Sequence, residues 1–144
     1  MKKGRSHALR IGRYSQSGQI YYLIFTTQKR EPIFSNPLAA RQAVLALRQL
    51  SPSADTIAFV VMPDHIHWLM HLKDSYSLSE TVKLFKKLCT RALKQSIWQT
   101  GFYDHAVRSE ESIIDIARYI VMNPVRAGLC RSVRNYPWWD CIYL

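Results

Sequence analysis

The sequence predicts an α+β domain with a ferredoxin-like fold, in which a βαββαβ order builds an antiparallel sheet, followed by one added C-terminal helix. Short runs rich in aromatic and β-branched residues alternate along the chain with longer segments of helical periodicity. Their order is strand, helix, strand, strand, helix, strand, helix, which is the split βαββαβ pattern with an extension. Apolar residues make up 48% of the 144 residues, so the chain can bury a core of its own.

The first half of the predicted fold consists of a strand, a helix and a second strand. Residues 19–28, QIYYLIFTTQ, are rich in aromatic and β-branched side chains and therefore predict a strand. Residues 35–50 predict a helix, because Asn36 is a suitable N-cap and Pro37 suits the first helical position. Residues 56–62, TIAFVVM, predict the second strand.

A Pro-Asp turn then leads into the predicted third strand, residues 65–72, HIHWLMHL. In the βαββαβ topology this strand is usually central. Residues 77–96 predict the second helix, because Ser77 and Glu80 match a capping box.

The C-terminal third is expected to hold a weaker strand at residues 102–109 and the added helix at residues 110–122. The segment NPVRAGL follows. Pro124 disfavours regular helix at Asn123, so Asn123 is a candidate cap for a short helical turn that ends at Gly128.

The formal net charge of +10 and the sequence pI of about 9.8 predict a polyanionic partner, most often nucleic acid. A membrane surface is the other possibility, but no apolar run approaches ~18 residues, and residues 1–14 have no apolar segment of a secretory signal. The three cysteines show no CxxC spacing, which is typical of free thiols in a reducing cytoplasm. They are Cys89, Cys130 and Cys141.

Two groups of basic residues are candidate DNA contacts. Residues 1–14 are expected to form a mobile basic arm before a single domain at residues 15–144. The basic residues of the arm are Lys2, Lys3, Arg5, Arg10 and Arg13.

The second group follows one face of the predicted helix at residues 77–96. Its members recur at spacings of three and four residues and are Lys83, Lys87, Arg91 and Lys94. Such a stripe is often only the solvated face of a helix, but its single sign and the charge of the chain favour phosphate contact. Four aromatic residues either stack on bases or anchor the core, and these are Trp98, Phe102, Trp138 and Trp139.

Two histidines stand out in the predicted third strand. Residues two apart on a strand share a face, so His65 and His67 lie about 6.6 Å apart at the backbone on one side of the sheet. Two imidazoles at that spacing can converge on one metal ion. Two half-exposed histidines near a turn are the alternative. We expect His71 to lie too far along the strand to join them, so a third ligand must come from elsewhere.

The predicted helix at residues 110–122 offers two candidates beside its apolar face. Tyr119 and Asn123 lie four residues apart at the edge of that face, so their side chains stack one above the other. Each has an ordinary alternative. Tyr119 could be a boundary residue, and Asn123 could be the helix cap described above.

The segments "MPDHIHWLM" and "ARYIVMNPVRAGL" together resemble the REP-associated tyrosine transposases. These belong to the HUH single-tyrosine nucleases, which include the transposases of simple insertion sequences. "HIH" resembles the His-hydrophobic-His motif of the family, "YIVMNPVRAG" its Tyr-Ile-x-x-Asn-Pro-Val segment, and "IWQTGFYDHAVRS" the segment between them. The resemblance covers most of residues 18–139, and the family has a ferredoxin-like fold.

The resemblance implies that Tyr119 is the nucleophile and that His65, His67 and Asn123 hold a divalent metal, Mg²⁺ or Mn²⁺. It implies a metal-dependent single-stranded DNA endonuclease and strand transferase that recognises DNA hairpins and forms a 5′-phosphotyrosine intermediate. The expected partner is single-stranded or hairpin DNA like a repetitive extragenic palindrome (REP). The expected enzyme is a monomer or homodimer at the nucleoid of the cytoplasm.

Two other function classes remain. One is a nucleic-acid-binding module on the same fold that does not cleave, although such a module would need none of the four residues. The other is a metal-dependent hydrolase that activates water and uses Tyr119 only structurally.

Overall fold

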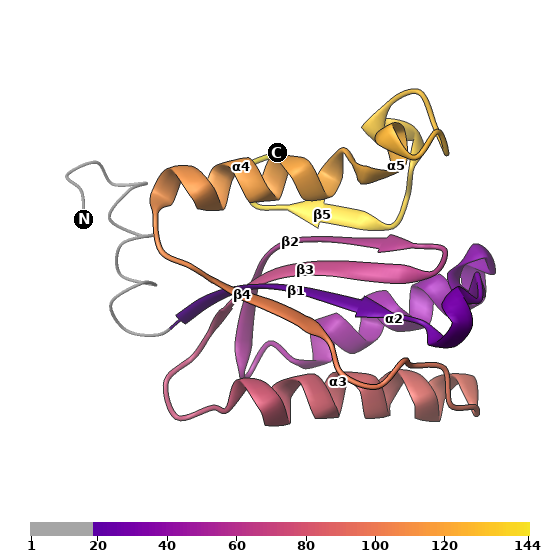
Figure 1. The fold of residues 1–144 in the computed structure, drawn as a ribbon, viewed down its shortest axis with the longest axis horizontal. Coiled ribbons are helices and arrows are strands. Elements are labelled where there is room, and N and C mark those ends of the chain that lie inside the picture. The colour runs from indigo at the N-terminus through magenta and orange to yellow at the C-terminus, as the bar shows by residue number, and fades with distance from the viewer. Residues whose placement is uncertain (1–18) are drawn as a thin grey trace.

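The computed structural model describes residues 19–144, so the predicted basic arm, with Arg5, Arg10 and Arg13, lies outside the described residues. A five-stranded antiparallel sheet forms the middle layer, in the order β4-β1-β3-β2-β5 (Figure 1). Its strands are β1 (Gln19–Thr26), β2 (Ala54–Met62), β3 (His65–Leu72), β4 (Tyr103–Val107) and β5 (Trp139–Cys141). The order of the first four strands confirms the predicted ferredoxin-like topology, with β3 in the centre.

Helices cover both faces of this sheet (Figure 1). On one face lie α2 (Pro37–Gln49) and α3 (Leu78–Leu93), and on the other lies α4 (Glu110–Val121), the predicted added helix. The short α5 (Asn123–Arg126) follows α4 after a break at Met122. The 3₁₀ turns are η1 (Gln28–Arg30), η2 (Ile33–Ser35) and η3 (Val133–Asn135).

The alternation of side chains along β3 divides the core into two parts. Trp68 and Met70 are fully buried on the side of α2 and α3. Leu69 points the other way and packs with Ile113 and Ala117 of α4. The sheet therefore has two covered faces, and His65 and His67 belong to the face of α4.

Capping side chains fix where the first two long helices begin. The Oδ1 atom of Asn36 accepts a hydrogen bond from the amide of Leu38 at 2.8 Å, which confirms it as the N-cap of α2. The Oγ atom of Ser77 accepts one from the amide of Glu80 at 3.2 Å and caps α3. At its other end α3 stops at Leu93, before the predicted end, because the next residue adopts a left-handed φ of 58°.

The break between α4 and α5 differs from the cap suggested by the sequence. Met122 is the N-cap of α5 and makes no capping hydrogen bond through its side chain, whereas Asn123 is the first residue of that helix. The short helix ends as expected at Gly128, whose φ of 77° few other residues adopt. The Asn123 side chain instead donates from its amide nitrogen to the carbonyl of Tyr119.

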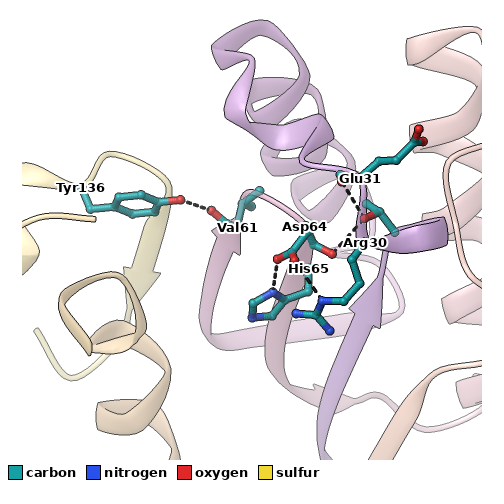
Figure 2. A network of polar contacts seen from close by, with 7 residues as sticks. Arg30, Glu31, Val61, Asp64, His65 and Tyr136 are labelled. Atoms are coloured by element: carbon teal, nitrogen blue, oxygen red, sulfur yellow. Dashed lines mark hydrogen bonds and ion pairs between the residues drawn. The ribbon is translucent and has the colours of Figure 1, made fainter. Parts of the chain in front are cut away.

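The edge strand β5 was absent from the predicted elements. Three residues are too few to show a period of two, so a local pattern could not reveal it. It forms because β2 offers unpaired backbone groups at its edge. The amide of Val61 donates to the carbonyl of Trp138 at 2.8 Å, and the hydroxyl of Tyr136 donates to the carbonyl of Val61 (Figure 2).

Candidate functional site

The two histidines lie at the start of β3, directly after the Pro63–Asp64 turn. Their ring centroids are 4.9 Å apart, which confirms that His65 and His67 share one face. His71 lies further along the strand, where its Nδ1 is 3.6 Å from a carboxylate oxygen of Asp55. As expected, His71 is not part of the pair.

His65 is oriented by a carboxylate. Its Nδ1 lies 2.7 Å from Oδ1 of Asp64, whose other oxygen accepts a hydrogen bond from Nε of Arg30 at 3.0 Å (Figure 2). Burial alone would raise the pKa of Asp64, but the hydrogen bond and charge of His65, together with Arg30, lower it. A carboxylate behind a histidine fixes the ring and its tautomer, so Nε2 is the nitrogen left to bind a metal.

His67 is buried and lacks a partner for one nitrogen. Its Nδ1 lies 2.7 Å from the hydroxyl of Tyr22, and the two rings stack with centroids 5.8 Å apart. Its Nε2 has no hydrogen-bond partner among the described residues. Burial, followed by the charges of His65 and Arg126, lowers the pKa of His67 to about 3, so the ring is neutral at pH 7. A neutral imidazole with an unpartnered nitrogen suits a metal ligand.

Tyr119, near the end of α4, approaches the histidines, and Asn123 at the start of α5 is hydrogen-bonded to it. The Tyr119 side chain lies beside His67, with ring centroids 6.3 Å apart, and the residue is 51% exposed. The amide nitrogen of Asn123 donates to the carbonyl of Tyr119 at 3.4 Å. Because this hydrogen bond uses Nδ2 of Asn123, the side-chain oxygen Oδ1 is the atom left to bind a cation.

The chemistry of these residues is compatible with a divalent metal. No group of three or more His, Cys, Asp or Glu side chains within residues 19–144 could hold a metal ion. Any third protein ligand beside the two histidines would therefore be of another type, and the amide of Asn123 is the candidate. Two imidazoles and an amide are neutral, so they leave the full charge of the cation to act on a phosphate.

Sequence reasoning missed Arg126. Its Cζ lies 3.9 Å from the centroid of the Tyr119 ring, and its Nη2 donates to the carbonyl of Tyr119. The seven-residue spacing could not reveal this contact, because the helix breaks at Met122 between the two residues.

Tyr22 was missed as well. Burial is the main cause of its raised pKa, and Tyr119 and Tyr103 raise the pKa further, so Tyr22 remains a protonated phenol. It supports His67 from β1, which pairs with β3. A β1 position on the histidine face was predictable from the topology once β3 was placed next to β1.

The basic stripe lies away from this site. All four of its members are exposed, but α3 covers the sheet face opposite to the histidines (Figure 1). Its members are Lys83, Lys87, Arg91 and Lys94. The structure therefore brings His65, His67 and Tyr119 together, with Asn123 bonded to the backbone of Tyr119, and places the stripe on the other side of the sheet.

The aromatic candidates act mainly as packing residues. Trp98 and Trp138 pack against the core beneath α2 and α3, where Trp98 also donates to the carbonyl of Lys86. Trp139 packs with the core beneath α4 and donates to the carbonyl of Val133. Phe102 lies 6.0 Å from Phe25, measured between ring centroids.

The sequence of the chain is similar to those of several known proteins. The sequence model of the family described as "Transposase IS200 like" matches residues 15–123. A REP-associated tyrosine transposase of Escherichia coli is 26% identical over 128 residues, which cover 87% of this chain and 77% of that protein. A Haemophilus influenzae protein named after the REP-associated tyrosine transposases is 29% identical over 100 residues, or 58% of this chain. The aligned segment spans little more than half of that relative, 57% of its length.

The fold also matches a solved structure. A REP-associated tyrosine transposase bound to a REP hairpin superposes with a TM-score of 0.74 at 24% sequence identity, covering 96% of this chain and 82% of that one. This likeness supports the arrangement of sheet and helices described above.

Proposed function

The chain belongs to the IS200-like transposase family of enzymes, and we propose that it is an HUH-type nuclease and strand transferase acting on single-stranded DNA. One observation carries the proposal. The exposed side chain of Tyr119 lies beside His67, whose buried Nε2 has no partner among residues 19–144. A nucleophile next to a candidate metal site is the arrangement that phosphoryl transfer requires.

In the proposed reaction, the hydroxyl of Tyr119 attacks the phosphorus of a DNA phosphodiester. A bond forms between Oη and phosphorus, and the bond from phosphorus to the 3′ oxygen breaks. The phenol loses its proton, and the leaving 3′ oxygen takes one up. The products are a 5′-phosphotyrosine and a free 3′-hydroxyl. Because the covalent link conserves the energy of the bond, another 3′-hydroxyl can attack it and join two DNA ends.

A divalent cation, Mg²⁺ or Mn²⁺, held by His65, His67 and Asn123 would offset the negative charge that grows on the phosphate. The residues of the chain prepare that site. Asp64 fixes the ring of His65, Tyr22 fixes that of His67, and burial keeps His67 neutral. The side chain of Asn123 is tied to the carbonyl of the nucleophile itself, so the proposed ligand and the nucleophile are held together.

The proposed substrate is a hairpin of the REP type with a single-stranded extension. The solved relative bound to a REP hairpin supports this choice, as does the net charge of +10. We propose that the stripe on α3 and the arm at residues 1–14 contact the phosphates of the hairpin.

Residues 15–144 would act as one nuclease domain, in a monomer or homodimer. Among the described residues, no helix is long and apolar enough to span a bilayer. We propose a location at the nucleoid.

The decisive experiment traps the covalent intermediate. Purified protein is mixed with an end-labelled REP-type hairpin and Mg²⁺, denatured and separated by electrophoresis. A labelled adduct that resists denaturation is expected in Mg²⁺ or Mn²⁺ and is expected to disappear in excess chelator.

His65→Ala and His67→Ala should each remove most of the adduct, whereas His71→Ala should retain it. A binding module would give no adduct, and a hydrolase that activates water would cut without one. Full adduct formation in chelator would overturn the metal site.

A further inference from the structure

A guanidinium group contacts the proposed nucleophile twice. The Cζ atom of Arg126 lies 3.9 Å from the centroid of the Tyr119 ring, and Nη2 donates a hydrogen bond to the backbone carbonyl of Tyr119. The planar guanidinium thus stacks on the ring that must attack and is also tied to the backbone of the same residue. Arg126 is therefore placed to orient Tyr119.

The positive charge of Arg126 is available to a ligand. Of the ion pairs found within residues 19–144, none includes Arg126, whereas the guanidinium of Arg30 is paired with Asp64. Arg126 is also exposed, so DNA can reach it. A guanidinium has five N–H donors, and the carbonyl of Tyr119 uses one of them.

Tyr119 connects this guanidinium to the histidine pair. The Tyr119 ring, on which Arg126 stacks, has its centroid 6.3 Å from that of His67. The His67 ring in turn lies 4.9 Å from the ring of His65, measured between centroids. The guanidinium, the tyrosine and the two histidines therefore form one chain of neighbouring side chains.

We propose that Arg126 binds a nonbridging oxygen of the scissile phosphate while its stacking contact orients Tyr119. The inference rests on the proposed nuclease function. As the bond from Oη to phosphorus forms and the bond to the 3′ oxygen breaks, negative charge accumulates on the nonbridging oxygens. A planar guanidinium can donate two parallel hydrogen bonds to such oxygens, and its charge stabilises them. Arg126 would then be the positive group that the chain itself supplies.

The competing explanation is structural. The bond from Arg126 to the carbonyl of Tyr119 also satisfies a backbone group near the end of α4, as a helix cap does. A cap alone would change the stability of the helix. It would not make binding depend on the charge of one particular phosphate.

The first test measures that dependence. The cleavage position in a REP-type hairpin oligonucleotide is mapped with wild-type protein. Binding is then measured with Tyr119→Phe, in chelator, to hairpins carrying a neutral methylphosphonate either at that position or two phosphates away. The neutral group at the scissile position should weaken binding about 10- to 100-fold, the range of a charged hydrogen bond.

Adding Arg126→Ala to Tyr119→Phe should remove this discrimination, so that both modified hairpins bind alike. Arg118→Ala is the matched control, because it removes an exposed arginine of α4 next to Tyr119 and should leave the discrimination intact.

The second test measures chemistry. Arg126→Ala should slow single-turnover adduct formation about 100-fold or more, as the loss of a donor to a developing oxyanion does. Added methylguanidine should restore part of the rate, and Arg126→Lys should not restore all of it, because an ammonium lacks the planar fork. Thermal unfolding of each variant reports whether the fold is retained.

The outcomes separate the two proposals. If wild-type protein forms no adduct, the nuclease function itself is overturned. If it forms the adduct, but Arg126→Ala keeps both the rate and the preference for the charged scissile phosphate, then Arg126 is only a helix cap. A slow Arg126→Ala variant that methylguanidine does not rescue, and that still discriminates, also overturns the phosphate contact.

Discussion

The two faces of the sheet differ in whether their buried polar side-chain atoms have hydrogen-bond partners. On the face of α2 and α3, Trp68 is fully buried, and its Nε1 donates to the hydroxyl of Thr56 at 2.9 Å. Around Trp68 lie the aromatic rings of Phe25 and Phe85. On the face of α4, His67 is also buried, but its Nε2 has no partner among the residues described.

This difference has a cost in stability and a use in binding. A buried polar atom without a partner costs about 1–3 kcal/mol, so the face of α4 carries a cost that the other face avoids. A ligand that binds Nε2 would remove the cost. We therefore expect substitutions on the face of α2 and α3 to affect mainly stability, and substitutions at the histidines on the face of α4 to affect mainly chemistry.

The largest expected effect comes from a substitution on the face of α4 that removes the reaction and leaves stability unchanged. Tyr119→Phe should abolish the covalent adduct, because the attacking oxygen is lost, while hairpin binding and thermal stability remain nearly unchanged. Tyr103→Phe, also at an exposed tyrosine, is the matched control and should retain the adduct. An adduct formed by Tyr119→Phe would mean that another residue attacks.

The next effect is on the opposite face and affects stability alone. Trp68→Ala should lower the free energy of unfolding by about 3–5 kcal/mol, because it removes a large, fully buried side chain and leaves a cavity. Urea unfolding measures this loss. If the two faces are independent, the remaining folded protein should form the adduct at the wild-type rate, and a parallel loss of rate would show that they are coupled.

A smaller effect, on metal affinity, is expected from substituting the carboxylate that contacts His65. Asp64→Asn should weaken metal binding about 10- to 100-fold, because the amide holds the ring of His65 less firmly than the carboxylate does. Calorimetric titration with Mn²⁺ measures the affinity directly. Asp55→Asn is the control, since Asp55 lies near His71 and not near the pair. Equal losses in both variants would indicate a general charge effect.

The smallest effect should come from the outer surface of α3. Lys83→Ala combined with Lys87→Ala should weaken binding to matched and scrambled hairpins alike, because phosphate contacts carry little sequence information. Each lost contact to single-stranded DNA should reduce the slope of log affinity against log salt by roughly 0.7.

Arg41→Ala combined with Arg48→Ala removes the same charge from α2, where no DNA contact is proposed. If only the α2 pair changed the salt slope, the DNA surface would lie on that helix.

Local pattern predicted most of the fold. The strands and helices follow from periodicity, and the caps at Asn36 and Ser77 follow from residue type, because each depends on neighbours in sequence. The strand β5 could not be predicted in this way. Its three residues form a strand only because the edge of β2 is available to pair with them.

The candidate site divides in a similar manner. The shared face of His65 and His67 follows from the alternation of a strand, and the proximity of Tyr119 to Asn123 follows from the pitch of a helix. The side chains that support them come from distant segments. Tyr22 reaches His67 from β1, and Arg30 reaches Asp64 from η1, across separations in sequence that no local pattern spans.

The sequence by itself predicted the order of elements, because helices and strands depend on contacts within a few residues. It also offered His65, His67, Tyr119 and Asn123 as candidates, whose proposed roles follow from the resemblance of their motifs to the transposase family. Only the tertiary structure decided that α4 covers the histidine face, that Arg126 stacks on Tyr119, and that the stripe on α3 lies behind the sheet. The physical reason is the packing of the helices. Which face of a sheet a helix covers depends on how its apolar side fits against all the strands together, so it is settled only when the chain has folded.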